Sequence, residues 1–225
     1  MRAPISVVIP TLNAEGGLPA CLSALGEGLA AGLIRELVVS DGGSTDGTLE
    51  LAEAAGAEIV TGPPSRGGQL RRGVEATKGD WVLVLHADTC LDPGWSEAVL
   101  PVLTQPCAGY FGLRFDARGL APVIVAGWAN LRSRLFGLPY GDQGLLIHRS
   151  LYDACGGYRD IPLMEDVALA RALQGNLRRL PGYVITSAAR YRRDGWLRRG
   201  ARNLWTLTRY GAGVSPERLA RQYRR

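Results

Sequence analysis

The stretch GDWVLVLHADT, residues 79–89, decides how the rest of the chain is interpreted. Its five apolar residues, Trp81 to Leu85, form a run that is too short for a helix and rich in Val, which is typical of a strand buried on both faces of a sheet. The polar residues His86 and Asp88 follow directly. In an open parallel sheet, ligands bind at the carboxyl ends of the strands. The stretch therefore predicts a buried strand whose end carries functional side chains.

Before this stretch, short apolar runs alternate with segments of helical spacing. The apolar runs predict three further strands, at residues 5–9, 35–40 and 57–60. The segments between them predict three helices, at residues 17–33, 48–55 and 66–76. Because a βαβαβαβ order implies right-handed crossovers, we expect an α/β fold with a mostly parallel central sheet and helices on both faces.

After Asp88 the pattern is less regular. We expect an antiparallel strand at residues 109–115 and a short strand at 145–148, with helices at 95–103, 122–136, 167–174 and 196–210. The chain contains no internal repeat and no obvious linker. We therefore predict one domain over residues 1–189, with a regular first part at about 1–90 and a less regular second part at about 91–189. A basic helical C-terminal extension follows at residues 190–225.

The bulk composition favours an ordinary globular protein of the cytoplasm. With 46% hydrophobic and 21% charged residues, the 225-residue chain can bury a sizeable core and carries no sign of disorder. Its four cysteines form no CxxC pair, which favours reduced thiols. We expect neither a secretory signal nor a membrane span, because the longest apolar window falls short of about 18 residues.

The charge is concentrated at the C-terminal end. Residues 190–225 contain eleven arginines against only Asp194 and Glu217, although the whole chain is only +5. Such a basic region predicts an anionic partner, either a membrane surface or phosphate, with a plain solvated surface as the alternative. The apolar residues Leu197, Leu204 and Trp205 of the same region equally allow a homodimer contact. We expect no nucleic-acid partner.

Polar clusters follow three of the predicted parallel strands, at residues 11–15, 41–44 and 86–88. Because the carboxyl ends of parallel strands meet at one edge of a sheet, Asp41 and Asp88 should border one crevice. An Asp before two glycines can bond a base or a ribose, while the alternative is a glycine-rich turn held by the carboxylate. Asp88 alone could cap a following helix. Arg66 and Gln69 open a predicted helix, whose amino end favours phosphate.

Five segments in order carry a resemblance to a known family. They are PTLNAEGGL, VVSDGGSTDGT, RGGQLRRGVEATKGDWVLVLHADT, GDQG and IPLMEDVALARAL. Together they resemble family 2 glycosyltransferases, whose GT-A fold is Rossmann-like. The likeness extends almost end to end, including the final GVSPERLARQYRR. It is nearest to a compact bacterial subgroup associated with radical-SAM or selenium-related gene neighbourhoods.

The resemblance implies an inverting transfer from a nucleotide-diphospho sugar, UDP- or GDP-linked, to an acceptor hydroxyl that could belong to a lipid. It also implies a nucleotide-sugar half at about residues 1–90 and an acceptor half at about 91–189. Asp88 matches the metal-binding carboxylate of the family's DxD motif, here for Mn²⁺ or Mg²⁺, and His86 stands in place of the first Asp. Asp166 matches the general base of the ED motif, with Glu165 beside it, although both could simply be acidic first-turn residues. The implied substrate-binding residues are Pro10, Thr11, Asn13, Glu15, Asp41, Gly42, Arg66, Gln69, His86, Ala87, Asp142 and Gln143.

Several roles and rival functions stay open at this stage. Tyr140 and Trp196 are candidate stacking surfaces, core packing is favoured for Trp128, and an ordinary strand-end role is favoured over metal binding for His148. A nucleotidyltransferase would share the sheet and the metal, but PTLNAEGGL lacks the usual Arg- and Lys-containing glycine loop. A non-catalytic nucleotide-sugar-binding protein is the second alternative. A dehydrogenase is disfavoured because no GxGxxG follows a strand.

Overall fold

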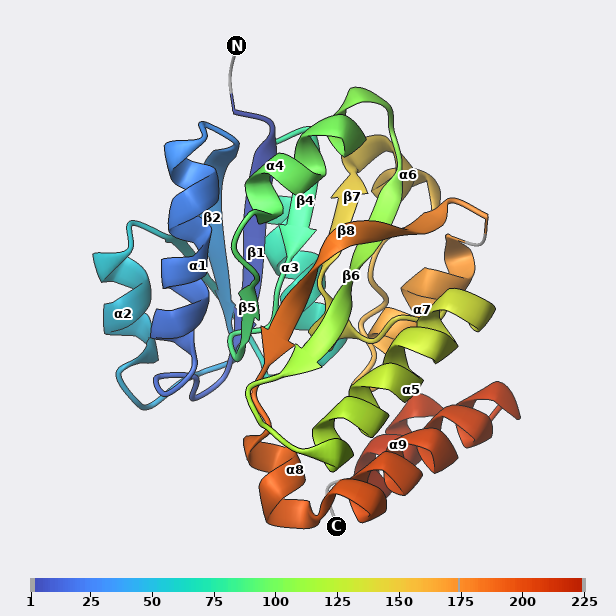
Figure 1. The fold of residues 1–225 in the computed structure, drawn as a ribbon. Coiled ribbons are helices and arrows are strands. Elements are labelled where there is room, and N and C mark those ends of the chain that lie inside the picture. The colour runs from blue at the N-terminus through green and yellow to red at the C-terminus, as the bar shows by residue number, and fades with distance from the viewer. Residues whose placement is uncertain (1–2, 174, 224–225) are drawn as a thin grey trace.

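The computed structural model describes residues 3–173 and 175–223. Its eight strands form one mixed sheet in the order β3-β2-β1-β4-β7-β6-β8-β5 (Figure 1). The strands are β1 (Ile5–Thr11), β2 (Ile34–Asp41), β3 (Glu58–Thr61), β4 (Trp81–Val84), β5 (Thr89–Leu91), β6 (Ala108–Phe115), β7 (Leu145–His148) and β8 (Leu177–Thr186). The first four strands are parallel to one another, as the sequence predicts.

Helices cover both faces of the sheet. They are α1 (Leu18–Ala30), α2 (Thr48–Ala54), α3 (Arg66–Ala76), α4 (Trp95–Val99), α5 (Leu120–Phe136), α6 (Arg149–Ala154), α7 (Glu165–Ala172), α8 (Ala189–Asp194), α9 (Trp196–Gly211) and α10 (Pro216–Tyr223). Two short 3-10 helices, η1 (Leu100–Thr104) and η2 (Gly141–Gln143), complete the set. The core clusters place α1, α4 and α5 on one face and α3, α6 and α7 on the other.

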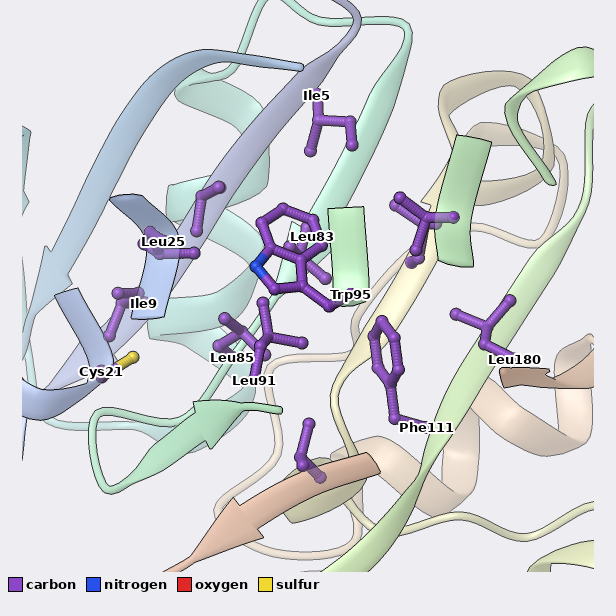
Figure 2. Close-up of a cluster of buried hydrophobic side chains, with 14 of the residues drawn as sticks. Ile5, Ile9, Cys21, Leu25, Leu83, Leu85, Leu91, Trp95, Phe111 and Leu180 are labelled. Atoms are coloured by element: carbon purple, nitrogen blue, oxygen red, sulfur yellow. The ribbon is translucent and has the colours of Figure 1, made fainter. Parts of the chain in front are cut away.

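Alternation along the central strands explains these two layers. In β1, Ile5 and Ile9 face the α1 side while Val8 faces the α3 side, because successive strand residues point to opposite faces. Figure 2 shows Trp95 of α4 among the apolar side chains of the first layer. It is 2% exposed and donates its indole N–H to Ala24 O at 3.1 Å. A Cβ at Gly28 would meet its ring at 2.3 Å, so glycine lets α1 approach this closely.

The structure corrects the expected sheet in its second half. β6 is antiparallel to β7, as predicted, but it also pairs in parallel with β8, a strand that the sequence did not predict. Pro181 and Gly182 interrupt the alternation of β8, and its register with β6 shifts between Tyr110 and Gly112. The three-residue β5 was also missed. It pairs with the end of β8 and is the outermost strand on that side of the sheet.

Element ends differ by a few residues from those expected. The helix predicted at 95–103 divides into α4 and η1, and α5 begins at Leu120 rather than Pro122. Helix α7 ends at Ala172, and Gln174, the last residue predicted for it, lies outside the described residues. Within the described residues, no helix combines the length and apolar character that crossing a membrane requires.

The C-terminal helices pack against the turn that leads into α7. Leu219 of α10 is 2% exposed and joins a small core with Leu163, Met164 and Val167. Helix α9 contacts α5 on its other side, and α8 and α10 both contact α9. Residues far apart in the sequence are therefore brought together around the start of α7.

Candidate active site

Two adjoining cavities lie at the carboxyl edge of β1 and β4. The β1 cavity, about 600 Å³, is bordered by Pro10, Thr11 and Asn13 after β1. The α7 cavity, about 100 Å³, is bordered by Asp142 and Asp166. The two cavities share a wall, which consists of Arg66, His86, Asp88, Glu165 and Arg190. Parallel pairing of β1, β2 and β4 brings the segments that follow these three strands to one edge, as the sequence predicts.

Backbone and side-chain hydrogen bonds join the loops that follow β1 and β2. Asn13, with a left-handed φ of 50°, accepts from Thr45 N–H through Oδ1 at 2.9 Å. Glu15 Oε2 accepts from Gly47 N–H at 3.1 Å. Asn13 still borders the β1 cavity, whereas the structure places Glu15 outside its wall. Both side chains therefore shape the loop that follows β2.

Asp41 points into its own turn and does not border the cavity. Its carboxylate is 1% exposed and accepts from Gly43 N–H, Ser44 N–H and Ser44 Oγ, and from Thr11 Oγ1 at 2.8 Å. Burial alone would raise the pKa of Asp41, but these hydrogen bonds outweigh it and lower the pKa. Gly42 donates its N–H to Thr11 O at 2.9 Å. A base could bond Asp41 only if one of the internal bonds opened.

The two glutamines predicted as ligands support the site from beneath. Gln69 borders the β1 cavity, but its amide N–H groups bond Thr11 O at 2.6 Å and Ser40 O at 3.1 Å, which holds the ends of β1 and β2 together. Gln143 is 0% exposed and donates to Phe111 O at 3.1 Å. Its Oε1 accepts from Ser133 Oγ at 2.5 Å, so the buried amide is held by internal hydrogen bonds and does not border the α7 cavity.

An ion pair crosses the shared wall. Arg66 Nε donates to Glu165 Oε1 at 2.9 Å, and the side chains are 42% and 1% exposed, respectively. Burial raises the pKa of Glu165 to about 7, against the opposing effect of Arg66. The N–H groups of Gly67 and Gly68 already bond Ile161 O and Ser65 Oγ. The two cavities are therefore bordered by the guanidinium of Arg66 and not by the backbone N–H groups at the amino end of α3.

His86 is held as a neutral imidazole between the two cavities. Burial, and after it the nearby Arg66, lower its pKa to about 4 against the pull of Asp88 and Asp166. A Cβ at Gly141 would meet His86 Nε2 at 2.5 Å, so only glycine lets the loop before β7 pass this close. On the opposite side, a Cβ at Gly17 would lie 2.9 Å from Ala87 O, which packs the start of α1 against this segment.

Asp166 is aimed into the α7 cavity by an unusual turn. Met164 before it has a φ of 68°, which non-glycine residues rarely adopt and which tends to occur at functional sites. Asp166 Oδ2 accepts from Gly141 N–H and Oδ1 from Val167 N–H, both at 2.7 Å. Across the cavity, burial raises the pKa of Asp142 to about 6. Within the described residues, Asp142 Oδ1 and Glu165 Oε2 are buried without a hydrogen-bond partner.

The donor set suits a divalent ion only in part. The described residues contain no group of three His, Cys, Asp or Glu side chains that could hold a metal. Asp88 offers one half-buried carboxylate at the shared wall of both cavities. Mg²⁺ and similar hard ions bind through one or two carboxylates together with substrate phosphates. The residues therefore fit an ion whose coordination a bound diphosphate completes.

The structure also places four further residues that the sequence singles out. His148 pairs with Trp81, at the amino end of β4, because β7 runs antiparallel to β4. It caps α6 and stacks edge-on against Trp81 at 5.1 Å, far from the cavities in the sheet register. Trp128 is 46% exposed on α5, so the favoured core role is wrong. Trp196 stacks on Tyr191 at 4.9 Å, and Tyr140 borders the α7 cavity.

The sequence did not reveal the contribution of the C-terminal helices. Arg190, at the start of α8, is exposed and borders both cavities. The side chains of Tyr191, Arg199, Asn203 and Tyr223 also border the α7 cavity. The only available signal was the density of arginine after residue 189, which predicts an anionic partner without saying which arginine meets it.

Comparison with known proteins agrees with this architecture. The profile described as Glycosyl transferase family 2 matches residues 6–159. A PGL/p-HBAD biosynthesis glycosyltransferase of Mycobacterium tuberculosis (strain ATCC 25177 / H37Ra) is 38% identical over 99 residues, which cover 40% of this chain and 38% of the relative. An uncharacterised glycosyltransferase of Mycobacterium tuberculosis (strain ATCC 25618 / H37Rv) is 38% identical over 138 residues, covering 58% of this chain and 60% of the relative.

Solved structures give the same result for the fold. Glucosyl-3-phosphoglycerate synthase from Mycobacterium tuberculosis, in complex with Mn²⁺, UDP and phosphoglyceric acid, superposes with a TM-score of 0.56 at 26% identity, over 78% of this chain and 67% of that one. TarS from S. aureus superposes with a TM-score of 0.61 at 16% identity, over 82% and 60% of the two chains. The predicted GT-A fold is confirmed. The chain spans 38% to 60% of the curated relatives cited above. Because the family profile covers more than half of the sequence, the chain belongs to glycosyl transferase family 2.

Proposed function

We propose that the protein is a glycosyltransferase that moves a sugar from a nucleotide-diphospho sugar to an acceptor hydroxyl. The observation that carries this proposal is the wall shared by the two cavities. It combines two cationic side chains, Arg66 and Arg190, with the carboxylate of Asp88. Of these two cavities, Asp166 borders the α7 cavity and not the β1 cavity. We therefore assign the donor nucleotide to the β1 cavity and the acceptor to the α7 cavity.

The donor would lie with its nucleoside against Pro10, Thr11 and Asn13 and its diphosphate against the shared wall. The β1 cavity, at about 600 Å³, is within the size range of small-ligand sites. Arg66 and Arg190 would offset the negative charge of the diphosphate. The mycobacterial synthase is solved with UDP, which favours a UDP-sugar donor over a GDP-sugar donor here. Asp41 would act mainly through the loop that it holds.

A divalent ion, Mn²⁺ or Mg²⁺, would be held by Asp88 together with the diphosphate. When bound, such an ion supplies positive charge that stabilises the departing nucleoside diphosphate. Structures of the mycobacterial synthase contain Mn²⁺ or Mg²⁺ with UDP. Neutral His86 adds no charge to this site, so the single carboxylate makes metal affinity depend on the nucleotide being present.

Asp166 would take the proton from the acceptor hydroxyl. As its oxygen attacks the anomeric carbon, a new carbon–oxygen bond forms and the bond to the diphosphate oxygen breaks, with the electron pair leaving on the diphosphate. Attack from the opposite face inverts the anomeric configuration. The bonds from Gly141 and Val167 fix the carboxylate plane while each oxygen keeps a further lone pair for the proton.

Three finer sequence predictions accompany this function. The resemblance to the compact bacterial subgroup with radical-SAM or selenium-related neighbours stays a prediction. A cytoplasmic location with peripheral association at the inner face of the membrane also stays a prediction. The domain boundary at residue 189 stays a prediction as well.

The test begins with a thermal-shift screen of UDP-, GDP- and dTDP-sugars with Mn²⁺, because a ligand that binds only the native state raises its melting temperature. Release of nucleoside diphosphate from the donor that binds is then measured with water or added alcohols as acceptors. Asp166→Asn should lower this release by about 10²–10⁴-fold, the usual contribution of a general base, with unchanged donor binding.

The matched control is Asp153→Asn, because Asp153 is exposed on α6, at the end of the strands opposite to the cavities. It should leave release unchanged. Full release by Asp166→Asn would contradict the assigned base, and failure of every donor to bind would contradict the proposed function itself.

A further inference from the structure

Apolar side chains are concentrated on one outer surface, formed by α5 and α9. These two helices contact each other at one side of the molecule (Figure 1). Ten of the thirteen large hydrophobic residues exposed in the described chain lie on them. We call this the α5–α9 surface, and it comprises Leu120, Val123, Ile124, Trp128, Leu131, Leu135, Phe136, Leu197, Leu204 and Trp205.

The outward face of α5 is more apolar than a solvated helix face should be. Its inward positions are small or polar, such as Ala126, Ala129 and Ser133, which are buried. Its outward positions include Val123 at 67% exposure and Leu135 at 63%. A helix at the surface of a globular protein normally has the reverse arrangement. The core therefore does not explain the apolar residues that point away from it.

Exposed residues of the two helices meet where α5 contacts α9. Trp128 of α5 and Leu204 of α9 border the same small cavity between the helices. Trp205, 65% exposed, follows directly on α9. Contiguous apolar patches of this kind mark interaction sites, whereas single exposed hydrophobic residues do not.

Unpaired arginines accompany the apolar residues. Arg134 lies between Leu131 and Leu135 and is exposed on α5, Arg118 is exposed just before α5, and Arg198 is exposed on α9. Within residues 3–173 and 175–223, none of these three forms a salt bridge with a carboxylate. Their charge is thus available to an external anion.

The exposed apolar residues and unpaired arginines of the α5–α9 surface together distinguish between two candidate occupants, a second copy of the chain and an anionic bilayer. A second copy joined through a two-fold axis would present the same arginines to each other, because both subunits use the same patch. An anionic bilayer instead offers phosphate groups to the arginines and an apolar interior to the leucines, while tryptophan side chains suit the boundary between them. The charge pattern therefore favours the bilayer.

We propose that the α5–α9 surface docks the protein on a membrane that contains anionic phospholipid. The small cavity between the two helices is also bordered by Tyr140, Asp142 and Tyr191, which border the α7 cavity as well. Docking would therefore hold the candidate active site next to the lipid headgroups. The docking does not depend on the proposed transfer reaction and is measured without it.

The experiment is flotation of the full chain with vesicles of phosphatidylcholine containing phosphatidylglycerol, compared with vesicles of phosphatidylcholine alone. The wild type should float with the anionic vesicles at low ionic strength and be released by salt, since salt screens exposed charges. The double variant Val123→Glu/Trp205→Glu should bind at least about tenfold more weakly, because both apolar side chains would leave the bilayer. Arg134→Gln/Arg198→Gln should bind more weakly and with a smaller salt dependence.

Leu29→Glu is the matched control, because Leu29 is 65% exposed on α1, away from the α5–α9 surface. It should float like the wild type, and all variants should keep the wild-type melting temperature because the altered residues are exposed. Absence of wild-type flotation would overturn the proposal, as would equal flotation of Val123→Glu/Trp205→Glu. A concentration-dependent dimer in sedimentation velocity that Trp205→Glu abolishes, without vesicle binding, would assign the surface to a second copy instead.

Discussion

Glu165 is a buried carboxyl group whose environment opposes its charge. The side chain is 1% exposed, and burial raises its pKa to about 7 although Arg66 acts in the other direction. In the unfolded chain the ordinary value is 4.5. Between these two pH values, the carboxyl group of Glu165 therefore holds a proton in the folded state that it has lost in the unfolded state. The stability that this proton contributes is present below pH 4.5 and is lost as the pH rises to about 7.

Replacing Glu165 by Gln removes this titration. The free energy of unfolding of Glu165→Gln, taken relative to the wild type, should rise between pH 4.5 and 7 because only the wild type loses stability there. Urea denaturation at several pH values measures it. The control Glu75→Gln removes an exposed partner of Arg71 and should give an offset that hardly changes with pH. An offset for Glu165→Gln that is constant or falls with pH would contradict the account.

At the scale of the elements, the start of α3 depends on the close approach of a distant loop. A Cβ at Gly67 would meet Arg159 O at 2.0 Å, and Gly67 N–H bonds Ile161 O at 3.2 Å. Gly67→Ala should therefore destabilise the protein by about 1–3 kcal/mol, the usual effect of overpacking. Because this contact positions Arg66, donor affinity should fall as well.

Chemical denaturation and donor calorimetry measure both effects. The control is Gly26→Ala in α1, where nothing lies within 4 Å of the added Cβ. That change should stabilise by about 0.5–1 kcal/mol, since Ala is the better helix former. Equal stability of Gly67→Ala and the wild type would show that the loop yields without strain.

The elements that could be predicted are those whose own sequence carries the burial pattern. β1 and β4 are apolar on both faces because helices cover both sides, so each is visible as a short apolar run. β8 is not visible in this way, since Arg178, Arg179 and Pro181 are exposed around the buried Leu180, and buried residues alternate regularly only toward the end of the strand. Its place between β6 and β5 depends on partners distant in the sequence. Local patterns cannot specify such a pairing.

The limit of local sequence patterns also explains which parts of the candidate site could be predicted. Asp88 and Asp166 stand out because one follows a buried strand and both match motifs of the family. That Asp41 and Gln143 are held by internal hydrogen bonds is a property of their three-dimensional neighbours. Arg190 borders the cavities only because β8 delivers α8 to that edge.

At the scale of the whole molecule, the C-terminal helices and the site share a core. Leu219 is 2% exposed and packs with Leu163 and Met164, directly before the carboxylates of α7. Leu219→Ala should lower the free energy of unfolding by about 2–5 kcal/mol, the range for a buried leucine. It should also slow release of nucleoside diphosphate, because the turn that aims Asp166 loses its support.

Denaturation and release assays test this coupling, with Leu29→Ala as the control at an exposed leucine. The control should change stability by less than about 0.5 kcal/mol. Unchanged stability and release in Leu219→Ala would mean that the C-terminal helices contribute nothing to the fold around α7.

The most direct test of the central claim is calorimetric titration of the donor nucleotide sugar with and without Mn²⁺. Wild type and the control Asp153→Ala should bind more tightly with Mn²⁺, whereas Asp88→Ala should lose this gain and keep its melting temperature. Equal donor affinity of the wild type with and without Mn²⁺ and Mg²⁺, or a full metal-dependent gain in Asp88→Ala, would contradict the metal-assisted site at the wall between the two cavities.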